Sequence, residues 1–201
     1  MRNRLSFVFI ATFCLLLLQA GPAAAARNFP LQGDNELSGG IGFAADLSDF
    51  TPGGFRWFNE YAVLIGGITW LDFQLNLTVG DHRSDYCVMT KKGLVCNRRG
   101  FDGTGLELGV GAKFKWRLQR VPLQFHAKVG GAVDFIWFGG DFLGVGIPFR
   151  GGGGARYFVL PTLGVGAELM FAVGPSFIDD WGVEVYGTIE MNFGVEWRFS
   201  L

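Results

Sequence analysis

The sequence predicts an all-β fold, a closed eight-stranded antiparallel up-and-down transmembrane β-barrel. The first observation is a regular alternation from Trp181 to Leu201, with apolar residues at every second position and mostly charged or small residues between them. Successive side chains of a strand point to opposite faces, so this segment has one apolar and one charged face. The second is glycine, at 32 of 201 residues, where roughly 7 % is usual and small residues suit a narrow, twisted barrel. The third is that long and short connections alternate between such segments, as in barrels of this kind.

The N-terminus has the features of a secretory signal peptide, which we expect to cover residues 1–26. Arg2 and Arg4 precede an apolar stretch from Leu5 to Leu18, and four alanines supply small residues for cleavage before Arg27. The alternative is an uncleaved membrane anchor, but the apolar run is short for a spanning helix. Residues 27–34 then form a short lead-in, and the barrel is expected over residues 35–201.

The expected strands follow one another along the chain with different degrees of clarity. The first, third, fourth, fifth and seventh alternate cleanly, as when Leu71, Phe73 and Leu75 oppose Asp72 and Gln74. The second is apolar on both faces, and the sixth is rich in glycine. In chain order the expected strands cover residues 36–47, 57–65, 71–80, 105–116, 123–137, 151–159, 163–173 and 181–201.

The connections predict which end of the barrel is elaborated. Those after the first, third, fifth and seventh strands are long, and the segment from His82 to Gly103 is the longest. Those after the second, fourth and sixth are short, such as Gly66-Gly67 and the turn at Pro161. Long external loops and short periplasmic turns are typical of barrels that span an outer membrane.

Charge excludes one class of partner. Removing Arg2 and Arg4 from the 17 basic residues leaves 15 against 18 acidic ones, a formal charge of −3. No basic stripe is present, so nucleic acid is not expected as a partner. No mature segment reaches the roughly 20 apolar residues of a spanning helix.

The charged face is expected to point into the barrel, where it forms a polar network. An eight-stranded barrel is just wide enough for side chains to fill. One interpretation is therefore a lumen plugged by ion pairs and hydrogen bonds, and the other is a narrow gated path for small solutes. The lumen residues we expect to form this network are Glu107, Lys113, Lys115, Lys128, Asp134, Glu168, Glu184, Glu190, Glu196 and Arg198. The inward face also includes Glu36, Asp46, Asp72, His126 and Arg156.

Two cysteines remain in the mature chain, and both lie in the long segment between the third and fourth strands. Cys87 and Cys96 would enter an oxidising compartment after secretion, so we expect a disulfide that holds this loop in shape. Zinc is the alternative, but no other Cys or His lies at ligand spacing. We expect no metal and no cofactor.

Aromatic residues gather near the ends of the expected strands. Trp116, Trp137, Trp197 and Phe199 are the main examples. Amphipathic rings favour the boundary between membrane and water, so these residues predict an aromatic girdle.

The strand rhythm, the segment 152–159 before a proline turn and the ending Trp197-Arg198-Phe199-Ser200-Leu201 carry a family resemblance. Together they resemble the eight-stranded outer-membrane barrels of Gram-negative bacteria, the OmpA-type transmembrane domain and small porin-like proteins. The resemblance implies contact with outer-membrane lipids and lipopolysaccharide. It also implies recognition of the aromatic C-terminal strand by the barrel-assembly machinery, although Phe199 lies two residues before the end.

His82-Arg83-Ser84 is similar to the His-x-Ser element of lipid A deacylases, which are small outer-membrane barrels. His82 could serve as a base and Ser84 as a nucleophile. Those enzymes also need an acid, and no Glu lies between Ser84 and Gly103. Two polar residues at a strand rim share a face by default, so these are weak candidates and we expect no catalytic residue.

The expected function is that of a non-enzymatic outer-membrane barrel with a structural or surface-interaction role and limited small-solute passage. Three alternatives remain open: a narrow channel for small or apolar solutes, a lipid-modifying enzyme, and a secreted soluble barrel of the lipocalin kind. The lipocalin alternative would require apolar residues inside and polar residues outside. The sequence does not identify a partner for the external loops.

Overall fold

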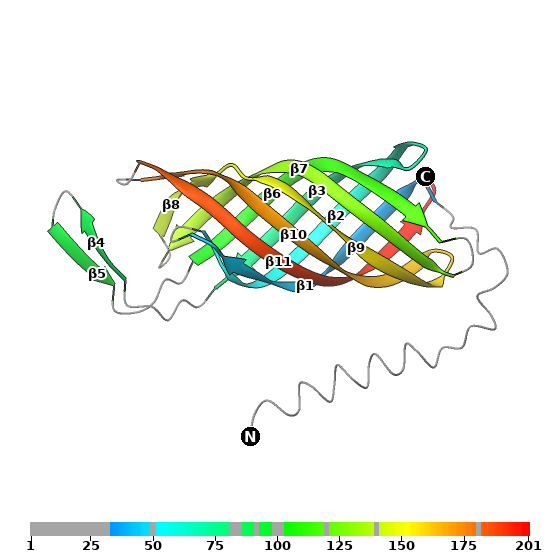
Figure 1. Cartoon of the computed structure of the whole chain (residues 1–201), viewed down its shortest axis with the longest axis horizontal. Helices are drawn as coiled ribbons and strands as arrows, with labels where there is room; N and C mark the ends of the chain where they lie inside the picture. The colour runs from blue at the N-terminus through cyan, green and yellow to red at the C-terminus, as the bar shows by residue number, and fades with distance from the viewer. Residues whose placement is uncertain are drawn as a thin grey trace, which may run out of the picture.

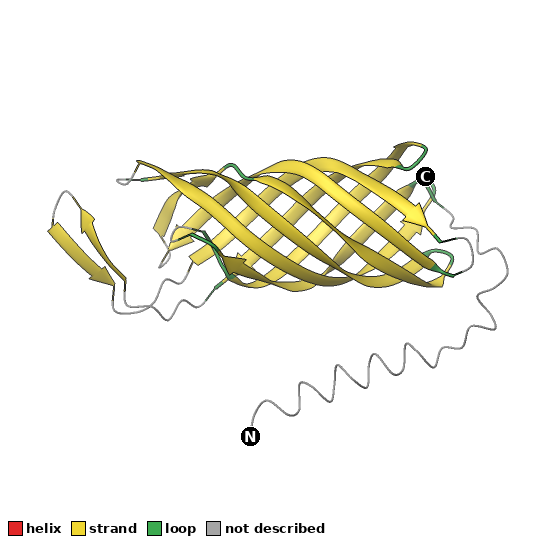
Figure 2. Cartoon of the chain, in the orientation of Figure 1, coloured by secondary structure: helices red, strands yellow, loops and turns green. Residues whose placement is uncertain are grey.

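The computed structural model describes residues 33–48, 51–80, 86–90, 93–97, 103–118, 121–138, 141–179 and 182–201. The expected signal peptide and nearly all of the lead-in lie outside these residues. Among the described residues, no helix is long and apolar enough to cross a membrane. Strands make up the regular structure of the described chain (Figure 2).

The structure contains eleven strands among the described residues. Their bounds are β1 Asn35–Asp46, β2 Gly54–Gly66, β3 Thr69–Val79, β4 Tyr86–Thr90, β5 Gly93–Asn97, β6 Gly103–Arg117, β7 Leu123–Phe138, β8 Asp141–Gly146, β9 Phe149–Leu160, β10 Leu163–Ile178 and β11 Gly182–Phe199.

Eight of these strands close into a ring in the order β11-β1-β2-β3-β6-β7-β9-β10, with β10 pairing back to β11 (Figure 1). All the pairings are antiparallel, and β1 meets β11 over its full length, from Asn35 opposite Phe199 to Asp46 opposite Thr188. The closed ring leaves no free sheet edge, which a membrane-spanning sheet requires. The predicted eight-stranded antiparallel barrel is therefore confirmed.

The two ends of the barrel differ, and we name them the turn end and the loop end. The turn end carries the short β2–β3, β6–β7 and β9–β10 connections together with the C-terminus (Figure 1). The loop end carries the β4–β5 hairpin, β8 and the β10–β11 connection (Figure 1). At the turn end, Gly67 takes a φ of 58°, a left-handed conformation that glycine adopts without strain.

The prediction that residues 139–150 form a loop was wrong. This segment contains β8, which pairs with β7 and β10, and the first residues of β9. The two strands lie in line and are separated by Ile147 and Pro148, whose backbone still joins the wall: Ile147 N donates to Pro175 O at 2.8 Å, and Ala132 N donates to Pro148 O at 2.9 Å. The two prolines, Pro148 and Pro175, are compatible with strand pairing here because each contributes only its carbonyl oxygen, as a hydrogen-bond acceptor.

Two further boundaries differ from expectation. β10 continues to Ile178 through the segment that was expected to begin a loop at Gly174, because Pro175 faces Val185 and contributes only its carbonyl. The expected long loop from His82 to Gly103 contains the β4–β5 hairpin, which pairs only with itself among the described strands. Smaller differences include β2, which begins at Gly54 instead of residue 57.

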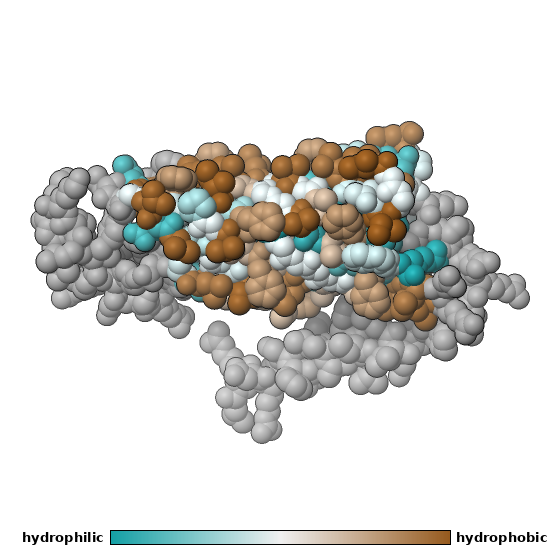
Figure 3. Space-filling model, turned by 45° about the horizontal axis from the view of Figure 1, so that its top comes forward, coloured by the Kyte–Doolittle hydropathy of each residue, from teal (hydrophilic) through white to brown (hydrophobic). Residues whose placement is uncertain are grey.

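Alternation sorts the side chains as the sequence predicts for a barrel in lipid. On β11, Glu190 and Glu196 are fully buried inside, while Phe193 and Trp197 are 48 % and 52 % exposed outside. Apolar residues cover much of the outer surface in the view of Figure 3. A water-soluble protein buries its apolar side chains and exposes its charges, so this distribution is reversed.

Candidate functional site

The interior of the barrel is lined by buried charges of both signs. Among the described residues, eight acidic and seven basic side chains are buried there, together with His126. The acidic ones are Glu36, Glu60, Asp72, Glu107, Asp134, Glu168, Glu190 and Glu196; the basic ones are Arg56, Lys113, Lys115, Lys128, Arg150, Arg156 and Arg198. This near balance lets charges pair across the lumen, and pairing is what buried charges need.

The cluster nearest the turn end joins opposite sides of the barrel. Glu36 of β1 accepts hydrogen bonds from both Lys113 and Lys115 of β6. Arg198 of β11 contacts Glu196 at 2.7 Å. Aromatic faces take part as well: the Lys115 Nζ lies 3.7 Å from the centre of a Trp70 ring. Cation–π contacts and ion pairs together fill this section.

The middle cluster is centred on Glu60 and Glu168. Glu60 of β2 accepts hydrogen bonds from Lys113, at 2.8 Å, and from Lys128. Lys128 also contacts Glu168 of β10 at 2.8 Å. The same Glu168 carboxylate lies 3.2 Å from Arg156 Nη2 and 3.2 Å from His126 Nε2. Lys113 contacts both Glu36 and Glu60, so it links the middle cluster to the cluster nearest the turn end.

Nearest the loop end, four side chains form what we call the ion-pair ring: Arg56, Glu107, Arg150 and Glu190. Arg56 contacts Glu107 at 2.9 Å and Glu190 at 3.3 Å. Arg150 contacts the same two carboxylates. The four residues come from β2, β6, β9 and β11, which is every second strand around the barrel. Charges of alternating sign therefore close a circuit across the whole section of the lumen.

Neutral polar side chains support the ion-pair ring. Asn76 donates to Glu107 at 2.6 Å, and Arg56 donates to Thr78 at 3.0 Å. Thr188 donates to Glu190 at 3.1 Å, and Arg150 also donates to Gln74. These contacts fix the carboxylates and guanidinium groups in place, because a planar guanidinium fork has a defined donor geometry.

Beyond the ion-pair ring the lumen becomes apolar, and we call this part the mouth. Ile136, Ala172, Ile178 and Tyr186 are buried together there, and Leu143 packs against them. The Tyr186 hydroxyl donates to Asp134 at 2.9 Å. From the β1–β2 connection, the hydroxyl of buried Thr51 accepts a hydrogen bond from Gly187 N at 3.0 Å. This connection is thus held against β11.

A pocket of about 440 Å³ opens at the rim of the mouth. Its walls are Leu143, Gly144, Val145, Phe177, Ile178, Asp179, Gly182 and Val183. Only Asp179 among these carries a charge.

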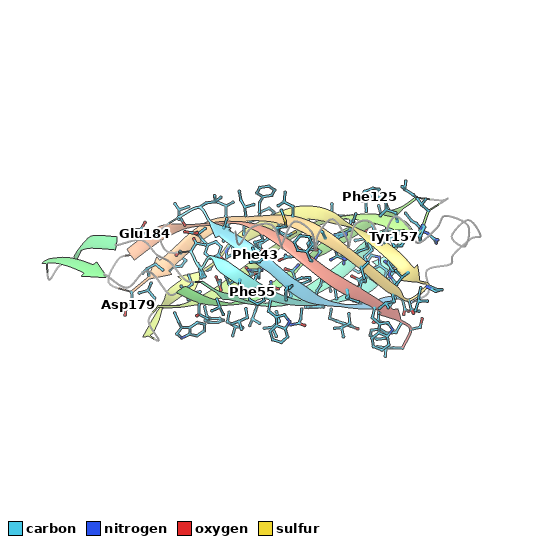
Figure 4. The ribbon with its side chains drawn as sticks, turned by 90° about the horizontal axis from the view of Figure 1, so that it is seen from below. Phe43, Phe55, Phe125, Tyr157, Asp179 and Glu184 are labelled. Atoms are coloured by element: carbon cyan, nitrogen blue, oxygen red, sulfur yellow. The ribbon has the colours of Figure 1, made fainter. Side chains whose placement is uncertain are left out.

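The structure places nine of the ten predicted lumen residues among the buried side chains, all but Glu184. Glu184 is half-buried at the loop end, opposite Ser176, and takes no part in the three clusters (Figure 4). The network also contains Arg56, Glu60 and Arg150, which the sequence analysis missed. Arg56 and Glu60 lie four residues apart on one face of β2, and Arg150 lies six before Arg156 on β9. Those even spacings were the available signal.

Of the predicted girdle residues, Trp116 and Trp197 point outward at the turn end and are about half exposed. Phe199 lies beside Trp197, with ring centres 5.0 Å apart. Trp137 lies toward the loop end, beside Phe135 at 6.4 Å. Phe125 and Tyr157 lie toward the turn end, whereas Phe43 and Phe55, with rings 6.3 Å apart, lie nearer the loop end (Figure 4).

The other predicted site residues are the two cysteines of the β4–β5 hairpin and the weak catalytic candidates His82 and Ser84. Cys87 and Cys96 are paired in the backbone register of the β4–β5 hairpin. His82 and Ser84 lie outside the described residues. Among the described residues, no group of His, Cys, Asp and Glu could hold a metal ion.

Comparisons with known proteins establish the fold but no closer relationship. No family model matches the sequence, and no curated protein is significantly similar to it. Among solved structures, Neisserial surface protein A (NspA) is similar at 16 % identity and a TM-score of 0.59, covering 83 % of this chain and 97 % of NspA. The outer membrane protein OprG from Pseudomonas aeruginosa has 8 % identity and a TM-score of 0.61, covering 86 % and 98 %. The N-terminal β-barrel domain of Pseudomonas aeruginosa OprF has 12 % identity and a TM-score of 0.53, covering 84 % and 100 %.

Proposed function

Starting from a fold shared with outer-membrane barrels, we propose that this protein is an integral barrel of a Gram-negative outer membrane. Its lumen is closed, and it acts through its structure and its surface instead of as an open pore. The observation that carries the proposal is the ion-pair ring of Arg56, Glu107, Arg150 and Glu190, which crosses the lumen from every second strand.

The distribution of apolar residues supports a membrane location. Ile41, Phe43, Met191 and Phe193 are each about half exposed or more on the outer wall. Such a surface would be unfavourable in water, because contiguous exposed apolar patches of that extent mark a membrane or an interface. The charged interior argues against the lipocalin alternative, which requires an apolar lumen.

The packing of the lumen favours a plug over a channel. Three clusters succeed one another from turn end to loop end, and each joins strands that are not neighbours in the wall. A continuous water path would have to pass between paired charges that contact each other directly. Buried charges are costly to separate from their partners, which makes a spontaneous opening rare.

The loop end is the side we assign to surface interaction. It carries the β4–β5 hairpin, whose strands pair with no other described strand. Outer-membrane lipids and lipopolysaccharide surround the wall in this proposal, and the barrel-assembly machinery engages β11. The enzyme alternative depends on His82 and Ser84, which are not described, and no described residue adds to it.

Surface labelling of cells tests location and orientation together. The full chain is expressed in a Gram-negative host with an epitope inserted after Thr90 in the β4–β5 hairpin. The matched control carries the same epitope after Gly67 in the β2–β3 turn at the other end. We expect antibody to stain intact cells with the Thr90 insertion, and to stain the Gly67 insertion only after the outer membrane is permeabilised.

The proposal fails if the chain fractionates as a soluble protein. It also fails if both epitopes stay hidden in intact cells, or if the Gly67 epitope is the exposed one.

A further inference from the structure

The outward apolar row extends further toward the loop end on β11 than on β1, its hydrogen-bonded neighbour. On β11 the outward apolar row runs from Trp197 to Val183, fourteen positions, and on the β1 side it runs from Leu37 to Leu47, ten positions. At about 3.3 Å per residue and a tilt of roughly 40°, these rows rise about 35 Å and 25 Å. The apolar band of such barrels is about 25 Å tall. The β11 side therefore extends about 10 Å further as an apolar surface.

The mouth pocket lies at the loop-end limit of this longer row. Val145, Phe177 and Val183 lie side by side on three neighbouring strands, and Phe177 pairs with both of the others. They belong to the outward row, and Val183 is 65 % exposed. The next row contains Gly144, Ile178 and Gly182, also in register. This row faces the lumen, where Ile178 is buried, and the glycines on both sides of Ile178 leave a gap beside its side chain.

Gly144 has little freedom to change, and this preserves the gap. A Cβ atom at Gly144 would lie 2.1 Å from the carbonyl oxygen of Phe177, which is closer than any real contact. Gly182 has a φ of 92°, which other residues rarely adopt. The geometry of the chain therefore requires small residues at two positions of the pocket.

The chemistry of the pocket fits an apolar chain. A volume of about 440 Å³ falls within the roughly 300–1,000 Å³ of sites that take small organic ligands. The walls are aliphatic and aromatic, and the apolar mouth of Ile136, Ala172 and Ile178 lies next to them. Below the mouth, the ion-pair ring stops any occupant from passing further.

We propose that this pocket seats one acyl chain of a lipid from the surrounding leaflet. The pocket is continuous with the outward apolar row of β11, so an acyl chain reaches it along that row without crossing water. The lipid is bound by its tail. This inference rests on the membrane location proposed above.

Photocrosslinking in vesicles tests the assignment. The full chain is refolded into phosphatidylcholine vesicles that contain a phosphatidylcholine with a diazirine near the end of one acyl chain, and crosslinked residues are mapped by mass spectrometry. We expect crosslinks at Phe177 and Ile178 that saturate as the probe fraction rises. Crosslinks at Met191 and Phe193 in the middle of the wall should instead rise in proportion to the probe.

A matched pair of variants separates the pocket from general lipid contact. Val183→Trp fills the pocket, whereas Val195→Trp places the same ring twelve positions away on the same outward row of β11. We expect Val183→Trp to lose the saturable crosslinks and Val195→Trp to keep them.

Each other outcome overturns a different claim. Crosslinks at Met191 and Phe193 without a saturable component at Phe177 or Ile178 would overturn the acyl-chain seat and leave the membrane location intact. The absence of crosslinks at all four positions would overturn both. A pocket that takes an apolar dye from water in detergent micelles but gives no crosslink in vesicles would assign it to soluble solutes.

Discussion

We call the part of the lumen from the turn end to the ion-pair ring the lower lumen. Charged side chains fill the lower lumen, whereas apolar side chains pack together in the mouth. In the lower lumen, Glu60, Lys113 and Glu190 are fully paired with opposite charges. At the mouth, Ile136 and Ile178 pack together with Tyr186, whose hydroxyl donates a hydrogen bond to Asp134. The difference shows that the lumen below the mouth is closed by ion pairs, whereas the rim is open to apolar contact.

The largest effect should come from removing one member of the ion-pair ring. Arg150→Met leaves Glu107 and Glu190 buried with one cation fewer between them. Breaking a buried charge network in this way costs about 3–5 kcal/mol. Urea unfolding of the barrel in lipid vesicles, followed by tryptophan fluorescence, measures the loss.

A conservative change in the mouth provides the control for that prediction. Ile136→Val removes one buried methylene group and should cost about 0.5–1.5 kcal/mol. If Arg150→Met proves no more destabilising than Ile136→Val, the two regions do not differ as described.

A smaller effect is expected where the two regions meet. Tyr186→Phe removes the hydroxyl that donates to Asp134 and leaves the packing of the ring in place. Loss of a hydrogen bond to a buried acceptor costs about 1–3 kcal/mol. The same unfolding measurement applies. An unchanged stability would mean that Asp134 does not depend on Tyr186 for its hydrogen bonding.

The smallest effect on the barrel should come from the β4–β5 hairpin. Cys87 and Cys96 lie opposite each other in register, which is compatible with the predicted disulfide. We expect both thiols to resist alkylation until a reductant is added, as read by mass spectrometry. The Cys87→Ser/Cys96→Ser double variant should unfold at the same urea concentration as the wild type, because the hairpin pairs with no other described strand. Free thiols in the secreted protein would contradict the disulfide.

Alternation in the sequence predicted the barrel wherever one face was uniformly apolar. β11 and β3 show this, because their inward residues are polar and their outward residues apolar. The alternation is unclear on β2, because Phe58 and Ala62 share the inner face with Arg56 and Glu60. The lumen accepts Phe58 because Gly194 leaves room: a Cβ there would lie 2.6 Å from the Phe58 ring. That compensation comes from a strand far away in the sequence.

The segment around β8 shows a second limit of sequence reasoning. Gly144, Gly146 and Pro148 suggest a loop by composition, yet β7 and β10 supply the pairing partners that make the segment a strand. Arg150 was therefore placed in a loop when it completes the ion-pair ring. Local composition describes what a segment prefers alone, whereas the closed wall determines what it becomes.

The account depends most directly on the closure of the lumen, which single-channel recording in planar bilayers can test. We predict that the refolded mature protein gives no discrete current steps at any applied voltage. We also predict that the Arg56→Ala/Arg150→Ala double variant, which removes both guanidinium groups from the ion-pair ring, does give them. Reproducible steps from the wild-type protein would contradict the closed lumen.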